Sequence, residues 1–88
     1  PPYMSIPVSR PWEIVGMDIV GPLPMTASGN RYILVVTDHF TKWVEAFAMK
    51  DQTAATIAHK VIKGVLCRHS FPEKILTDQG RNFRSELI

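Results

Sequence analysis

Two aspartates, Asp18 and Asp78, have the sequence context of carboxylates that take part in chemistry. Asp18 lies in the run Trp12 to Val20, WEIVGMDIV, which is otherwise almost wholly apolar and is typical of a strand covered on both faces. A buried carboxylate without a partner is costly, so a metal ion, a buried arginine or a hydrogen-bond donor must compensate it. The strand alone leaves the metal-binding and the structural interpretations open.

Asp78 follows the short apolar run Lys74 to Thr77, KILT, and precedes a glycine turn. Ligands of α/β sheets tend to lie beyond the carboxyl ends of strands. For TDQG alone, an aspartate that opens a turn with its own side chain is the favoured interpretation. The pair is more informative, because a strand over 74–77 that lay beside the first strand would bring both carboxylates to one edge of the sheet. Two carboxylates there predict a Mg²⁺ site suited to phosphoryl transfer.

The hydropathy pattern predicts the elements that would position these aspartates. We expect strands over residues 12–20, 31–37 and 42–49, with turns between them. Because the connections are short, the three strands should form an antiparallel meander. A short strand over 74–77 then follows a helix, and the last residues should begin a second helix at Asn82 or Ser85. The predicted order is β-β-β-α-β-α.

The helix is predicted from Thr53 to about Arg68, where apolar residues recur at helical spacing. Either Asp51 or Thr53 is suited to capping its start. Gly64 inside it indicates close packing on the sheet, since glycine costs about 1 kcal/mol against alanine in a helix. Lys60 and Lys63 are interpreted as part of its solvated face.

Composition limits the class of protein. The 88 residues predict at most one small domain, and 45% hydrophobic with 20% charged residues is a globular balance. We expect residues 1–11, which hold four prolines, to be a lead-in and 12–88 to be the domain. The net charge of +2 is compatible with a nucleic-acid partner but is common to many domains. The single cysteine favours an intracellular compartment, and no apolar stretch is long enough to span a membrane.

Three blocks carry a resemblance: PWEIVGMDIVGPLP, YILVVTDHFTKWVEAFAM and KILTDQGRNFRSEL. Together they resemble the integrase catalytic core of gypsy-type LTR retrotransposons and, more distantly, of retroviruses. The resemblance covers residues 7–88, and the blocks come in the family's order and spacing. It implies a ribonuclease-H-like α/β fold: a three-stranded antiparallel meander, then a helix and a parallel strand.

The resemblance also implies function. In that family, DNA ends are trimmed and the freed 3′-hydroxyl attacks a target phosphodiester, with two Mg²⁺ or Mn²⁺ ions held by Asp, Asp and Glu. Asp18 corresponds to the first aspartate and Asp78 to the second. Arg81 and Asn82 fall where family members approach DNA, although Arg81 has a solvated surface role as an equal alternative. A nuclear location and a homo-oligomer of the complete protein are implied as well.

The third acid of the family is expected about 35 residues after the second, so Glu86 falls too early for it. We therefore expect the sequence to be a truncated core that is inactive alone. Asp38 is interpreted as a turn residue and not as a ligand. The alternative function is a domesticated, integrase-like module that binds nucleic acid or acts as a scaffold without catalysis.

Overall fold

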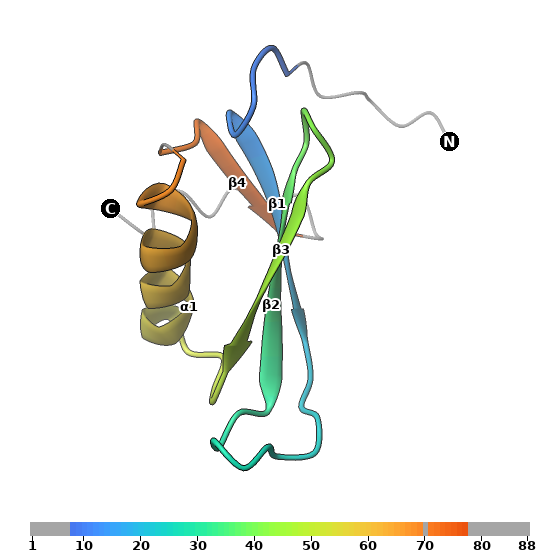
Figure 1. Ribbon diagram of the computed structural model, residues 1–88, viewed down its shortest axis with the longest axis vertical. Coiled ribbons are helices and arrows are strands. Elements are labelled where there is room, and N and C mark those ends of the chain that lie inside the picture. The colour runs from blue at the N-terminus through green and yellow to red at the C-terminus, as the bar shows by residue number, and fades with distance from the viewer. Residues whose placement is uncertain (1–7, 70, 78–88) are drawn as a thin grey trace.

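The computed structural model describes residues 8–69 and 71–77 of the chain. Four strands and one helix, which ends in a π-helical turn, make up this part of the molecule (Figure 1). The predicted second helix lies outside the described residues, as do residues 1–7 of the predicted lead-in.

Three strands form the predicted antiparallel meander. They are β1 (Ile14–Val20), β2 (Tyr32–Asp38) and β3 (Val44–Met49), and each differs from its predicted bounds by one or two residues at one end or both. β2 lies between the other two and pairs antiparallel with both. The β-branched and aromatic residues of these runs favour the extended conformation, and the short links between them allow only antiparallel neighbours.

The fourth strand, β4 (Lys74–Thr77), pairs in parallel with β1 and completes the sheet order β3-β2-β1-β4. Both the bounds of β4 and its place beside β1 were predicted. A parallel neighbour requires a crossover connection, which the helix supplies. The carboxyl ends of β1 and β4 therefore point the same way, as the two arrows in Figure 1 show.

Helix α1 (Ala54–Val61) continues into a π-helical turn, η1 (Ile62–Leu66), so the predicted single helix is present but changes its winding. The Thr53 side chain caps its start by accepting a hydrogen bond from the Thr56 N–H, as predicted. In η1 the N–H of Cys67 donates to the carbonyl of Ile62, five residues back. π-Helical turns of this kind commonly occur as short insertions in α-helices.

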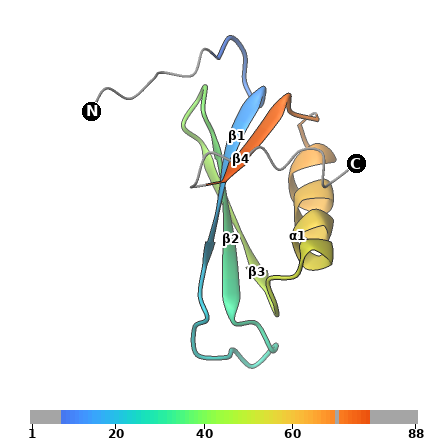
Figure 2. The ribbon, with the colours of Figure 1, turned by 180° about the vertical axis from the view of Figure 1, so that it is seen from behind.

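One face of the sheet packs against the helix. The views of Figures 1 and 2 agree that α1 lies alongside the sheet on one side. The buried cluster between them consists of Trp12, Val15, Met17, Leu34, Val36, Met49, Ile57, Val61, Val65 and Ile75. These residues alternate along the strands and recur every three or four positions along the helix, which is the pattern that a sheet-on-helix core requires.

The opposite face of the sheet is covered incompletely within the described residues. Asp18 and Val20 of β1 are exposed there, as are Val44, Ala46 and Ala48 of β3. The prediction that the first strand is covered on both faces is therefore wrong for its second half. An almost continuous apolar run is compatible with a strand covered on both faces and with a strand covered on one face only. Apolar residues such as valine are common on protein surfaces, so the sequence does not distinguish the two.

The prediction of close packing at Gly64 is confirmed by its contact with β3. A Cβ built at this position would lie within 3.0 Å of two atoms of the Phe47 ring, so a larger residue requires the ring or the helix to shift.

We expect Gly64→Ala to destabilise the fold by about 1 kcal/mol. Overpacking costs typically about 1–3 kcal/mol, and the better helix propensity of alanine returns about 1 kcal/mol of this. Urea unfolding of both forms measures the difference. Phe47→Leu should reduce the penalty in a double-mutant cycle, whereas an unchanged penalty would contradict the contact as its cause.

Candidate active site

Asp18 lies in the fifth position of β1 and projects from the sheet face that α1 does not cover. Its side chain is exposed, and it has no hydrogen-bond or ion-pair partner within the described residues. The expectation of a buried Asp18 is therefore wrong, and the carboxylate does not need a compensating group to be tolerated. It is a free pair of oxygen acceptors on a strand held on both sides by β2 and β4.

The neighbouring strand β4 ends one residue before Asp78. In the parallel register, Thr77 is the partner of Met17, the residue before Asp18. Asp78 itself lies outside the described residues, as do Arg81 and Asn82.

His39 shares the sheet face of Asp18 and was not singled out from the sequence. Its ring lies over Gly16, where an added Cβ would be 3.1 Å from the imidazole Nε2. Gly16 precedes Asp18 by two positions and so faces the same side. The backbone N–H of His39 donates to the Ile14 carbonyl at 3.0 Å, which fixes the start of this segment against β1. The glycine in WEIVGMDIV was the available signal, since it marks a close approach.

Asp38 is the aspartate that the structure buries completely. Its carboxylate accepts hydrogen bonds from the Trp12, Phe40 and Thr41 backbone N–H groups and from the Thr41 hydroxyl. Burial acts to raise the pKa of Asp38, but the hydrogen bonds from Thr41, Trp12 and Phe40 outweigh it and hold the pKa below 3.8. The interpretation of Asp38 as a turn residue is confirmed, and all of its acceptor capacity serves the fold.

A group of three ionisable side chains connects β3 to the segment after η1. The buried Glu45 carboxylate accepts a hydrogen bond from Arg68 at 3.0 Å and lies 3.1 Å from the His69 Nε2. The His69 ring stacks on Trp12, with ring centroids 3.8 Å apart. Sequence reasoning missed this group, because Glu45 occupies an inward position of β3 that the alternating pattern reserves for apolar residues. Its connections join three elements and point to a structural role.

Within residues 8–69 and 71–77, no group of three or more histidine, cysteine, aspartate or glutamate residues is placed to hold a metal ion. His59 on α1 and Cys67, which follows η1, are both exposed. In the same described part of the chain, no helix has both the length and the apolar character needed to cross a bilayer.

The order β-β-β-α-β, with a parallel fourth strand beside a first strand that presents a free aspartate, defines the N-terminal part of a ribonuclease-H-like core. The family model described as integrase core domain matches residues 8–88. The chain therefore belongs to the integrase core domain family, whose members act on DNA and generally use divalent metal ions.

Curated relatives agree with this family. The chain is 32% identical to gypsy retrotransposon integrase-like protein 1 of Rattus norvegicus over 85 residues, and 34% identical to that of Bos taurus over 87 residues. These matches cover 97% and 99% of the chain but only 16% and 17% of the relatives. The chain is also 41% identical over 59 residues, or 67% of its length, to the Gag-Pol polyprotein of woolly monkey sarcoma virus, of which it covers 4%.

Proposed function

We propose that the protein carrying this chain performs DNA integration, by trimming DNA ends and joining them to a target strand. The observation that carries the proposal is the free Asp18 carboxylate on β1, beside the parallel strand β4 and inside the match to the integrase core. The comparisons support the family. The chain spans only about a sixth of the length of these relatives, so the complete reaction is part of the proposal.

The residues present fit a divalent cation. A hard cation such as Mg²⁺ prefers carboxylate oxygens, and Asp18 offers two that no described residue uses. We propose Asp78 as the second ligand, because the residue before it pairs with the residue before Asp18. Side chains at matching positions of neighbouring parallel strands point to the same face. When bound, the cations supply charge stabilisation to phosphate oxygens of the reacting DNA.

The role of the chain's own residues is to hold these oxygens in place. Asp18 lies on a central strand with hydrogen-bonded neighbours on both sides, so its backbone has little freedom. A ligand on a rigid strand needs no reordering when DNA arrives, which is the condition for effective positioning. In the proposed two-metal arrangement, Asp18 and Asp78 would be the residues of this chain that hold the cations. Action on chromosomal DNA implies that the protein functions in the nucleus, which we include in the proposal.

The test is a strand-transfer assay with the intact protein. We expect it to join short duplexes bearing the element's ends to plasmid DNA in the presence of Mg²⁺ or Mn²⁺, and to lose this activity with EDTA. DNA binding without any joining in either metal would instead favour the domesticated module, which binds DNA without catalysis. A metal-independent joining reaction would contradict the proposed chemistry.

A further inference from the structure

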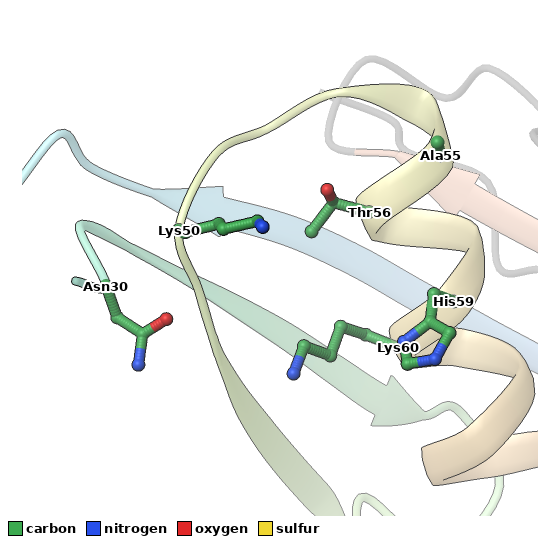
Figure 3. A pocket seen from close by; sticks show the side chains of 6 residues that line it. All are labelled: Asn30, Lys50, Ala55, Thr56, His59 and Lys60. Carbon is green, nitrogen blue, oxygen red and sulfur yellow. The ribbon is translucent and has the colours of Figure 1, made fainter. Parts of the chain in front are cut away.

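A basic pocket lies between α1 and the neighbouring strand ends (Figure 3). Its volume is about 380 Å³. The lining residues are Asn30, Lys50, Ala55, Thr56, His59 and Lys60. We refer to this site as the α1 pocket.

Three separate segments supply the side chains of the α1 pocket. Lys50 follows the last residue of β3, and Asn30 precedes β2. Thr56 comes from the first turn of α1 and Lys60 from its last turn. In Figure 3 the ammonium groups of Lys50 and Lys60 extend into the space between the helix and the strand ends, and the Asn30 amide faces it from the other side. The pocket thus gathers donors that are far apart in the sequence.

The α1 pocket carries a net positive charge. None of its lining residues is acidic, and the first turn of α1 holds no acidic residue. Neither lysine has an ion-pair partner within the described residues. The nearest carboxylate in the sequence is Asp51, whose Oδ1 accepts hydrogen bonds from the Thr53 N–H and hydroxyl. Hydrogen bonds from Thr56 and Thr53 and the charge of Lys50 lower the pKa of Asp51. This aspartate offsets one of the two lysine charges, and a net positive charge remains.

The donor set matches a phosphate group. Two ammonium groups, an amide and an imidazole can all donate hydrogen bonds to phosphate oxygens, and charge-assisted bonds of this type are the strong ones. The N-terminal end of α1 adds a favourable field for an anion. The pocket is half open, so a phosphate that belongs to a longer chain can enter it.

We propose that the α1 pocket binds a backbone phosphate of DNA. This inference rests on the proposed function, for which it supplies a second anchor on the same nucleic acid. The pocket lies at the end of the sheet where β1 ends, since Val20 pairs with Ile33 and Met49 pairs with Tyr32. Asp18 lies two residues before that end of β1, on the face that α1 does not cover, so DNA in contact with both sites would pass around this end of the sheet. Lys60, interpreted from the sequence as part of the solvated helix face, has a phosphate-binding role in this proposal.

The test is DNA binding by the full chain in EDTA, where no metal-dependent contact contributes. Lys50→Gln and Lys60→Gln are compared with Lys63→Gln, which removes the same charge from an exposed position outside the pocket. We expect each pocket variant to weaken the affinity for a short duplex about fivefold to tenfold at low salt. Each should also lower the slope of log K against log salt by about one, the value of one lost phosphate contact. Lys63→Gln should change the affinity less than about twofold.

Inorganic phosphate serves as the second probe. Added to the ¹⁵N-labelled chain, it should shift the amide signals of Lys50, Thr56, His59 and Lys60, and the same spectra show that the variants stay folded. Equal effects of Lys60→Gln and Lys63→Gln would overturn the proposal, as would phosphate shifts in the pocket without loss of DNA affinity in its variants. The outcome is separable from that at Asp18, because Asp18→Asn should leave metal-free DNA binding unweakened while removing metal-dependent joining.

Discussion

Asp18→Asn should abolish metal-dependent DNA joining by the intact protein while leaving its stability almost unchanged. The asparagine keeps the size of the side chain but loses the negative charge that a divalent cation requires. Metal ions contribute several kcal/mol of transition-state stabilisation, and a loss of about 4 kcal/mol is a decrease of about a thousandfold in rate. Because Asp18 is exposed and has no partner among the described residues, unfolding free energy should change by less than about 0.5 kcal/mol.

Two measurements separate this result from a general loss of function. Paramagnetic Mn²⁺ should broaden the amide signals of Asp18 and Thr77 first in the wild-type chain, and this selectivity should disappear in Asp18→Asn. Asp51→Asn is the matched control, since it removes an aspartate charge away from β1 and should retain joining. Full activity in Asp18→Asn would exclude this residue as a ligand.

The contrast between Asp18 and Asp38 shows what the sequence could and could not provide. Both aspartates interrupt apolar strand runs, and the sequence pattern predicted burial for Asp18 and a turn for Asp38. The structure exposes the first and buries the second completely. Whether each aspartate is buried depends on which face of the sheet α1 covers, and the residues on that face are set by the register between the strands. A shift of one residue in register exchanges the faces, so hydropathy along one strand cannot determine it.

The elements themselves were predictable because local and long-range requirements agree. The short links after β1 and β2 allow only hairpin neighbours, and the helix between β3 and β4 allows a parallel return. Side-chain chemistry limited the helix cap to Asp51 or Thr53, and the structure shows that Thr53 is the cap. The hydropathy pattern did not predict the change from α-helical to π-helical winding at η1. Gly64 is the one residue of this segment with a markedly poor helix propensity.

The candidate site was predictable in part. The aspartate positions came from strand placement together with the family resemblance, and the parallel pairing of β4 with β1 confirms the placement of the strands. The Glu45, Arg68 and His69 group was missed, because its members are 23 and 24 residues apart and meet only through the packing of the helical segment on β3. The α1 pocket was missed for the same reason, since Asn30, Lys50 and Lys60 come from three elements.

Asp38→Ala should produce the largest loss of stability of the substitutions considered, about 2–4 kcal/mol. The change removes the acceptor of four hydrogen bonds, and the Trp12 N–H is buried where water cannot replace it. Each unsatisfied buried donor costs about 1–3 kcal/mol, whereas the donors at Phe40 and Thr41 lie nearer to solvent and cost less. Because domains are typically stable by only about 5–15 kcal/mol, urea unfolding followed by tryptophan fluorescence should show a clear shift.

The pH dependence gives an independent test of the same carboxylate. The pKa of Asp38 in the folded chain is lower than its ordinary value of 3.8, so the ionised form is the one that stabilises the fold. Its contribution should be fully present above about pH 3.8 and should be lost as the pH falls through the lower, folded-state pKa. The stability difference between wild type and Asp38→Asn should therefore shrink below pH 3.8 and stay constant from there to neutrality. Asp51→Ala is the control, since loss of a carboxylate at the solvent-exposed start of a helix should cost much less stability than loss of the buried Asp38. Equal losses in Asp38→Ala and Asp51→Ala would contradict the assignment of Asp38 as the buried acceptor that joins β2 to the start of β1.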